Sequence, residues 1–316
     1  MERGTSIMPT DARTQRIIKA AREQAVQVAK QRAQVVKRRK KLLDALPEAS
    51  VAAGMTPLDA AGAEEAVTRG HLIAEGDSWF DYPGVDVVRV LEDELGFDVE
   101  SVARASDRVE MMAFGRDQLT RFSAAIEKVI RNNGTPKGIL LSGGGNDIAG
   151  TEFGFLLNHL GSPDAGPNES IVRGVIDERC RDAYIHILAA VTKLCEEKLS
   201  GQRVPILVHG YGHTVPDGRG FLGGAWLLPG PWLEPGFIEK GFNDAKQRQV
   251  IMDGLIDRFN VMLQGIVALT EFKHVKYIDL RGVLPNTPNK KTFWANELHP
   301  TARGFRAIAA KFAAAL

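Results

Sequence analysis

The sequence HLIAEGDSWFDYPG, residues 71–84, joins a short apolar run to a polar and aromatic turn. The run HLIA has the length and composition of a buried strand. Gly76 ends this run, and the polar pair Asp77-Ser78 follows it directly. A strand that stops at this point predicts a serine hydroxyl held at the end of a buried element.

The same alternation continues to the C-terminus. Short apolar runs recur at residues 71–74, 98–103, 138–142, 204–210 and 275–280, and longer segments with helical periodicity separate them. Five strands alternating with helices predict a parallel sheet covered on both faces, that is, a three-layer α/β/α fold. In such sheets the reacting groups lie in loops at the carboxyl ends of the strands.

The predicted helices of this domain include residues 86–96, 107–119, 244–269 and 301–316, and an interrupted helical region ends near Leu199. The 316 residues are 44% hydrophobic and carry a formal net charge of +1. These values are typical of an ordinary globular protein with one large or two modest domains.

The charge is unevenly distributed along the chain. Residues 11–41 contain eleven Lys or Arg residues and only two acidic ones, with no Gly or Pro. We therefore predict a basic helical extension at 1–45, a linker at 46–70 and the main domain at 71–316. The basic helix could contact an anionic membrane surface or a protein partner, or it could simply be solvated. A nucleic-acid partner is not favoured, because no DNA- or RNA-binding motif accompanies the helix.

The two cysteines, Cys180 and Cys195, lie in one predicted helix, roughly 22 Å apart at about 1.5 Å rise per residue. That separation excludes a disulfide between them. No secretory signal or membrane-spanning run is apparent, so we expect a cytoplasmic protein. No group of residues has metal-ligand spacing, and we expect neither a metal nor a cofactor.

Three predicted strand ends carry residues suited to acyl transfer. The first holds Ser78, whose hydroxyl is a weak nucleophile unless a base accepts its proton. The second is SGGGND at 142–147, where Asn146 offers an amide donor and glycines allow close backbone approach. The third is NELHPTARGF at 296–305, where His299 could be that base.

Each of these residues has an ordinary structural explanation when taken alone. Ser78 could only cap a turn, Asn146 could form an Asx turn, and His299 could merely begin a helix. The glycines of 142–147 could suggest a phosphate-binding loop, but the Gly-Lys-Ser/Thr ending of such loops is missing. The order Ser, Asn, His at successive strand ends is more specific than any one of the three.

These residues resemble the SGNH (GDSL-type) hydrolase family. Gly76-Asp77-Ser78 resembles its first block, Gly144 to Asp147 its third, and His299 with Pro300, Thr301 and Gly304 its last. The resemblance covers residues 71–316 and implies a flavodoxin-like α/β/α fold. It further implies ester or thioester hydrolysis without metal or cofactor, with Ser78 as nucleophile, Asn146 as oxyanion donor and His299 as general base.

Two positions depart from the family pattern. Ser106 stands where the second block supplies a glycine, although its backbone N–H, with that of Ser78, could still complete the oxyanion hole. Asn296 stands where an Asp usually orients the histidine, and Glu297 is its neighbour. We expect Asn296 to orient His299, with the pKa of His299 near or below its ordinary value. Glu297 would then face solvent or bind an Arg or Lys.

Aromatic residues are predicted to shape the site. Trp79 and Phe80 adjoin the nucleophile and would form walls of an acyl pocket. The loop 210–237 is long enough to be a lid or binding wall. Its aromatic residues could line the substrate site or only pack the loop onto the domain; they are Tyr211, Phe221, Trp226, Trp232 and Phe237. Among the other histidines, His213 in this loop is the one rival for the catalytic role.

The sequence thus predicts a serine hydrolase that cleaves a small-molecule or lipid carboxylic ester, an acyl or acetyl ester, through an acyl-enzyme. The substrate-binding residues would be Trp79, Phe80, Gly145, Tyr211, Trp226 and Trp232. One alternative is a lipase or phospholipase that acts at membrane surfaces through the basic helix. Another is a degenerate member of the fold that binds a partner without catalysis.

Overall fold

The computed structural model describes residues 10–44, 68–115, 117–150, 152–223, 228–286 and 290–316. Its centre is a five-stranded parallel sheet with the order β2-β1-β3-β6-β7. This is the flavodoxin-like order, and the fold prediction is confirmed. The strands are β1 (His71–Glu75), β2 (Asp98–Ser101), β3 (Gly138–Leu141), β6 (Ile206–His209) and β7 (Val275–Ile278).

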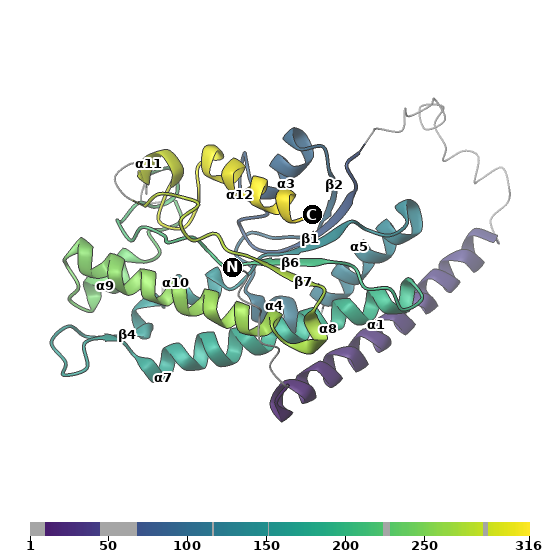
Figure 1. The fold of residues 1–316 in the computed structure, drawn as a ribbon, viewed down its shortest axis with the longest axis horizontal. Helices are drawn as coiled ribbons and strands as arrows, with labels where there is room; N and C mark the ends of the chain where they lie inside the picture. The colour runs from purple at the N-terminus through teal and green to yellow at the C-terminus, as the bar shows by residue number, and fades with distance from the viewer. Residues whose placement is uncertain (1–9, 45–67, 116, 151, 224–227, 287–289) are drawn as a thin grey trace, which may run out of the picture.

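Helices cover both faces of this sheet (Figure 1). One face carries α3 (Val87–Arg89), the π-helical turn η1 (Val90–Glu94) and α12 (Ala302–Ala315). The other face carries α4 (Val109–Phe114), α5 (Gln118–Asn133), α8 (Arg181–Lys198) and α10 (Ala245–Val267).

Shorter elements complete the described chain. They are α6 (Gly145–Ile148), η2 (Phe153–Leu156), β4 (Leu157–Asn158), β5 (Gly166–Pro167), α7 (Glu169–Val172), η3 (Arg173–Cys180), η4 (Phe221–Gly223), α9 (Glu234–Glu239), η5 (Thr270–Phe272) and α11 (Lys290–Phe293).

The central strands are apolar because both of their faces are covered. In β1, Leu72, Ile73 and Ala74 are fully buried, and every residue of β3 and β6 is buried as well. β1 pairs with β3 in the register Ile73 to Ile139. The carboxyl ends of β1, β3 and β6 therefore meet at one edge of the sheet, where Ser78 and the glycine loop follow.

Two local predictions are wrong in detail. The sequence predicts one helix over 107–119, but α4 ends at Phe114, and the next residue, Gly115, has an extended ψ of 139°. A Cβ on Gly115 would lie 2.4 Å from the carbonyl oxygen of Met111, so this sharp exit requires glycine. The region before Leu199 also contains a small antiparallel pair, β4 and β5, which apolar periodicity does not reveal because each strand has two residues.

The long N-terminal helix α1 (Ala12–Asp44) is present, as predicted. It packs along α8 outside the sheet layers rather than standing free (Figure 1). Ala21 and Ala25 are fully buried there, and Val28 belongs to the same core. Ion pairs also fix the rotation of α1 about its axis, since Arg22 lies 2.6 Å from Glu196 and Arg32 lies 2.6 Å from Glu127. The buried alanines and these ion pairs together make α1 part of the folded body.

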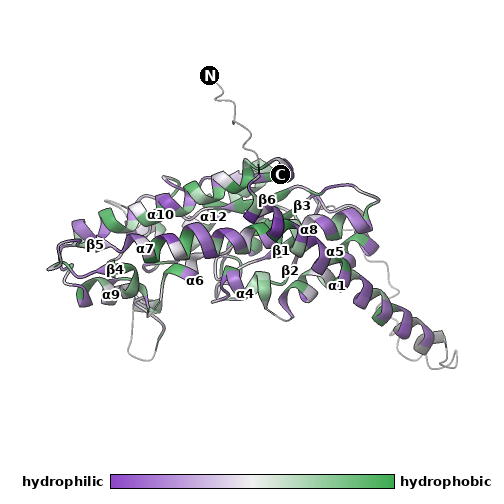
Figure 2. Cartoon of the chain, turned by 90° about the horizontal axis from the view of Figure 1, so that it is seen from below, coloured by the Kyte–Doolittle hydropathy of each residue, from purple (hydrophilic) through white to green (hydrophobic). Residues whose placement is uncertain are grey.

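The last turns of α1 extend past the rest of the described chain. Residues 33–38 are all exposed, and Figure 2 shows this end of the helix reaching away from the sheet. The expected linker, residues 46–70, falls almost entirely outside the described residues. Within the part of the chain that the structure describes, no helix is both long and apolar enough to cross a bilayer.

Candidate active site

Ser78, His299 and Asn296 form a chain of hydrogen bonds at the carboxyl edge of the sheet. Ser78 Oγ lies 2.8 Å from His299 Nε2, although 221 positions separate the two residues in sequence. On the other side of the ring, His299 Nδ1 lies 3.0 Å from Asn296 Oδ1. With Nδ1 protonated, Nε2 has its lone pair directed at the serine hydroxyl, which is the tautomer that a general base requires.

Two loops hold this arrangement together. Ser78 lies in the turn after β1, and His299 lies just before α12, whose first turn is capped by Thr301. The indole Nε1 of Trp79 donates to the carbonyl of Leu298 at 3.1 Å, which joins the serine loop to the histidine loop. The neighbours of Ser78 and His299 therefore set the distance between these two residues.

Aromatic rings enclose the imidazole. Tyr82 stacks on His299 with ring centroids 4.5 Å apart and an interplanar angle of 26°, and Trp232 meets the ring edge-on at 5.4 Å. His299 itself is 7% exposed. Burial lowers the pKa of His299 to about 4, because the protonated ring would lose its hydration. The neutral ring expected from the sequence is thus the state that this environment favours.

Asn296 is itself held by several contacts. Its Oδ1 also accepts the backbone N–H groups of Leu298 at 3.0 Å and His299 at 2.8 Å. Its Nδ2 donates to the hydroxyl of Tyr82 at 3.2 Å. The amide can satisfy all of these partners only with Oδ1 toward the histidine, so its orientation is fixed.

Glu297 has a different place from the one expected. It is fully buried, and among the residues that the structure describes no Arg or Lys side chain pairs with its carboxylate. Its two oxygens accept four backbone N–H groups at 2.6–3.0 Å, from Gly218, Trp232, Leu233 and Glu234. Burial raises the pKa of Glu297 although these hydrogen bonds oppose the change. Glu297 therefore anchors the 210–237 loop beside the histidine rather than orienting the ring.

The predicted oxyanion donors Asn146 and Ser106 line a cavity that Ser78 also borders. Asn146 borders both cavities that open beside the serine, and its Nδ2 donates one proton to the carbonyl of Asp107 at 3.0 Å. A side-chain amide has a second proton, which remains for a ligand. Ser106 has a φ of +70°, so the backbone here keeps the left-handed conformation that glycine favours, with serine in its place.

Gly144 explains why the 142–147 loop needs glycine. Its φ is +98°, and a Cβ there would lie 2.5 Å from the ring of Phe259. This close approach brings Gly145 and Asn146 to the start of α6, facing the serine loop. Gly145 donates its N–H to the hydroxyl of Tyr211 at 3.1 Å.

Asp77 shapes the serine loop. Its carboxylate accepts the N–H of Trp79 at 3.0 Å, the hydroxyl of Ser142 at 2.8 Å and the hydroxyl of Tyr211. These contacts join the ends of β1, β3 and β6. Asp147 has a similar role, accepting the N–H of Val109 at 2.8 Å, and burial raises its pKa to about 6.

Two cavities border Ser78 and His299, and we call them the inner and the outer cavity. The inner cavity has a volume of about 40 Å³ and is lined by Asp77, Ser78, Trp79, Gly145, Asn146, Ile148, Ala149, Tyr211, Thr214, Met252, Ile256, Phe259, Leu298 and His299. The outer cavity, of about 270 Å³, is lined by Ser78, Tyr82, Pro83, Ala105, Ser106, Asn146, Phe221, Leu228, Pro229, Trp232, Leu298 and His299.

Several predicted residues lie elsewhere. Phe80 lines neither cavity, so the expectation of an acyl-pocket wall is wrong; it packs in the core against His209 and Phe312. Phe237 is buried against Phe153, which is the packing role rather than the binding one. Trp226 lies outside the described residues.

The rival histidine is also separate from the serine. His213 Nε2 pairs with Asp257 at 3.1 Å, and His213 lines neither cavity that borders Ser78. Asp257 also contacts Arg281, so the pair belongs to a surface ion network. The described geometry thus leaves His299 as the histidine that contacts Ser78.

Two groups of residues at this site were not predicted from the sequence. Tyr82 lies four positions after Ser78 in the same turn, and its place in that aromatic stretch was the available signal. Met252, Ile256 and Phe259 come from α10, where their helical spacing indicates only a core-facing stripe. No pattern in the sequence tells which part of such a stripe borders the site.

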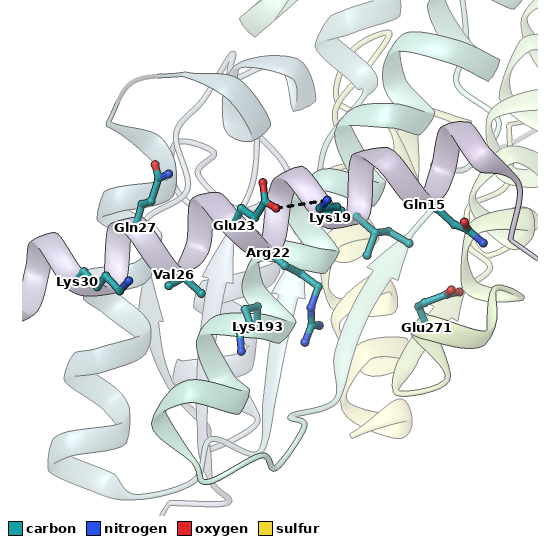
Figure 3. A pocket seen from close by; sticks show the side chains of 10 residues that line it. Gln15, Lys19, Arg22, Glu23, Val26, Gln27, Lys30, Lys193 and Glu271 are labelled. Carbon is teal, nitrogen blue, oxygen red and sulfur yellow. Dashed lines mark ion pairs between the residues drawn. The ribbon is translucent and has the colours of Figure 1, made fainter.

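A larger hollow lies away from this chemistry. It is an open groove of about 720 Å³ along α1, with Lys193 of α8 and Glu271 of η5 on its far side (Figure 3). Charged side chains dominate it, and Lys19 and Glu23 pair within it at 4.0 Å. Among the described residues, no group of three His, Cys, Asp or Glu side chains is placed to hold a metal ion.

Solved structures similar to this chain include SGNH- and GDSL-type hydrolases, esterases and lipases. One is a catalytic mutant of an acetylxylan esterase from Geobacillus stearothermophilus, with 14% identity, a TM-score of 0.40, and coverage of 78% of this chain and 93% of that one. Another is a carbohydrate acetylesterase from Sinorhizobium meliloti, with 13% identity, a TM-score of 0.39, and coverage of 78% and 99%. A third is the lipase/acylhydrolase from Enterococcus faecalis, with 14% identity, a TM-score of 0.39, and coverage of 78% and 94%.

These neighbours are of the class that the sequence motifs resemble. Protein-family models give no match to this sequence, and neither do curated protein sequences.

Proposed function

We propose that this protein is a serine hydrolase that cleaves carboxylic esters through an acyl-enzyme. The observation that carries the proposal is the continuous contact from Ser78 Oγ to His299 Nε2 at 2.8 Å and from His299 Nδ1 to Asn296 Oδ1 at 3.0 Å. A merely structural serine turn would not require a buried, neutral histidine directed at its hydroxyl.

In the first half-reaction Ser78 Oγ attacks the ester carbonyl carbon while His299 Nε2 accepts the hydroxyl proton. The carbonyl oxygen becomes an oxyanion, which would receive hydrogen bonds from Asn146 Nδ2 and the backbone N–H groups of Ser78 and Ser106. When the carbonyl re-forms, the bond to the alcohol oxygen breaks and His299 returns its proton to that oxygen. The alcohol leaves, and the acyl group stays on Ser78.

The second half-reaction reverses the roles with water. His299 accepts a proton from the water as its oxygen attacks the acyl carbon. The bond from that carbon to Ser78 Oγ then breaks, and Oγ takes back the proton from His299. Carboxylic acid is released, and no external oxidant, reductant or metal takes part in any of these steps.

Asn296 gives this mechanism a distinctive feature. An amide fixes the tautomer of His299 but supplies no negative charge to stabilise the imidazolium that forms in each half-reaction. The stacked face of Tyr82 supplies part of that stabilisation, because an aromatic face attracts a cation. Burial and a neutral amide partner both favour the unprotonated ring of His299. His299 can therefore act as a base already at mildly acidic pH.

The test is hydrolysis of 4-nitrophenyl acetate by the full-length chain and by Ser78→Ala and His299→Ala. We expect each substitution to lower kcat by roughly 10³-fold or more, since the residues of a catalytic triad act as a unit. The matched controls are Ser170→Ala and His159→Ala, two exposed positions that line neither cavity beside Ser78. A variant that folds and keeps a tenth of the wild-type kcat would refute the proposal.

A further inference from the structure

Glu75 is a buried acid that lies just before the serine turn. It is the last residue of β1, and its side chain is in the core, at 1% exposure. Its Oε1 accepts the backbone N–H of Gly76 at 3.1 Å, and its Oε2 has no hydrogen-bond partner among the described residues. Burial of an ionised carboxylate is costly unless its oxygens are paired, so this environment favours the protonated form of Glu75.

Both a carboxyl group and a guanidinium lie near Glu75. Asp107 disfavours a negative charge on it, whereas Arg121 and the side-chain amide of Gln118, both from α5, favour that charge. Burial is the largest effect, and with Asp107 it outweighs the favourable contacts and raises the pKa of Glu75 to about 8. Glu75 is therefore mostly neutral at pH 7.

Asp107 connects these buried groups to the predicted oxyanion hole. Its carboxylate accepts a side-chain N–H of Gln118, which is itself only 8% exposed. Its backbone carbonyl accepts Nδ2 of Asn146 at 3.0 Å. Its backbone N–H donates to the carbonyl of Arg104 at 3.1 Å, which closes the turn that contains Ser106. Asn146 and Ser106 are thus both held through Asp107.

The position of Asp107 matters because both donors depend on strict geometry. Ser106 has a φ of +70°, a conformation that a non-glycine residue keeps only where its surroundings hold it. An oxyanion donor must also lie about 2.7–3.1 Å from the developing charge. A displacement of Asp107 would therefore move the N–H of Ser106 and the amide of Asn146 away from the oxyanion.

We propose that Glu75 and Gln118 are positioning residues for the oxyanion hole and that they act through Asp107. Gln118 fixes the side chain of Asp107 by a hydrogen bond, and protonated Glu75 gives that side chain an uncharged neighbour. Loss of the Glu75 proton would place two like charges in one buried site, and their repulsion would displace Asp107. The inference rests on the proposed esterase function, and it requires that the oxyanion hole is intact only while Glu75 is protonated.

The first test is the alkaline side of the pH profile. For 4-nitrophenyl acetate, corrected for spontaneous hydrolysis, we expect kcat of the wild-type protein to fall as the pH rises through about 8. In Glu75→Gln a neutral amide replaces the carboxyl group, so kcat at pH 7 should stay close to that of wild type and the fall near pH 8 should disappear. Glu239→Gln, at a side chain that is 69% exposed, is the matched control and should keep the wild-type profile.

The second test removes the hydrogen bond to Asp107. In Gln118→Ala we expect kcat at pH 7 to fall roughly tenfold or more with little change in KM, because a displaced donor weakens binding of the transition state rather than of the ester. Gln247→Ala, at an exposed position near the start of α10, is the matched control. A lower Tm with an unchanged kcat in the folded Gln118→Ala variant would show a role in stability alone and would overturn the proposal.

A third measurement needs no substrate. The infrared difference spectrum between the wild-type protein and Glu75→Gln at pH 7 should contain a protonated carboxyl band from the wild-type protein. This band should vanish when both proteins are measured well above pH 8. Absence of the band at pH 7 would overturn the proposal whether or not an ester is hydrolysed.

The outcomes separate this inference from the proposed function. Hydrolysis that depends on Ser78 but shows no fall near pH 8, or the same fall in Glu75→Gln, overturns the positioning role and leaves the esterase intact. Failure to hydrolyse any ester would contradict the proposed function itself. If Glu75→Gln does not fold, the wild-type pH profile and Gln118→Ala decide the question.

Discussion

Asn296 orients the ring of His299 through the same oxygen that accepts the backbone N–H groups of Leu298 and His299. One amide oxygen thus fixes both the turn that presents the histidine and the tautomer of its ring. An aspartate at this position could accept the same three hydrogen bonds and would add a negative charge. The difference between the two side chains should appear in the pH dependence of activity.

We predict that kcat/KM of the wild-type protein rises with pH well below 6.5 and is level at neutral pH, because burial lowers the pKa of His299 to about 4. Asn296→Asp places an anion beside the ring, which stabilises the protonated form and raises its pKa, by roughly 1–3 units for a close charge. The acid limb of the pH profile should therefore move to higher pH. If the acid limb of the pH profile is the same in Asn296→Asp as in the wild-type protein, the contact between Asn296 and His299 is contradicted.

Asn146→Ala should lower kcat by roughly 10²- to 10³-fold with little change in KM. The reason is that an oxyanion donor interacts mainly with the transition state and only weakly with the bound ester. Steady-state kinetics on 4-nitrophenyl acetate measure both constants, and circular dichroism shows that the variant is folded. A folded Asn146→Ala variant with the wild-type kcat would show that Asn146 is not an oxyanion donor. Its role would then be structural, through its hydrogen bond to the carbonyl of Asp107.

Glu297→Gln tests the anchor of the 210–237 loop. The substitution replaces one carboxylate oxygen by an NH₂ group, which then faces two buried N–H donors without accepting from them. We expect the free energy of unfolding to fall by at least about 1–3 kcal/mol, and KM to rise because Trp232 lines the outer cavity. Chemical denaturation and ester kinetics measure these effects, and Glu239→Gln, on the exposed side of the nearby α9, is the control.

The same variants separate Glu297 from Asn296. If Glu297 rather than Asn296 orients the histidine, Glu297→Gln would lose most of its kcat while Asn296→Ala stays near wild type. The described contacts predict the reverse order, because Asn296 contacts the ring and Glu297 contacts only backbone N–H groups of the loop.

Ala25→Arg tests whether α1 is part of the folded body. Ala25 is fully buried between α1 and the core, so a long charged side chain there must displace its neighbours. Overpacking of this kind costs roughly 1–3 kcal/mol, and burial of the charge adds to it. Thermal unfolding should show a lower Tm than for Ala20→Arg, an exposed position on the same helix. Equal Tm values would mean that α1 does not pack on α8 in solution.

The sequence was most informative where local pattern and topology agree. The apolar runs at 71–74 and 138–142 predicted buried strands, and parallel topology then brought their carboxyl ends together. The approach of Ser78, Asn146 and His299 follows from that topology, because each residue comes directly after a strand or just before the last helix. These residues could therefore be proposed as a group although they are far apart in sequence.

Other features depend on packing that no local pattern encodes. Phe80 and Trp79 are adjacent in sequence, yet Trp79 borders the inner cavity and Phe80 enters the core, because successive residues of a turn point in different directions. Glu297 has the composition of a surface residue, and only the long loop folding over it supplies four backbone donors. The basic composition of α1 likewise concealed a stripe of small residues, Ala21 and Ala25, that fits against α8.

The central claim is that Ser78 is a nucleophile activated by His299. A fluorophosphonate probe tests it most directly, because such probes bond covalently to an activated serine. Intact-mass spectrometry of the full-length chain should show one adduct, and peptide mapping should place it on Ser78. We predict that Ser78→Ala shows no adduct and that His299→Ala reacts far more slowly than the control His159→Ala. No adduct on the folded wild-type chain, or an adduct that persists in Ser78→Ala, would contradict the account.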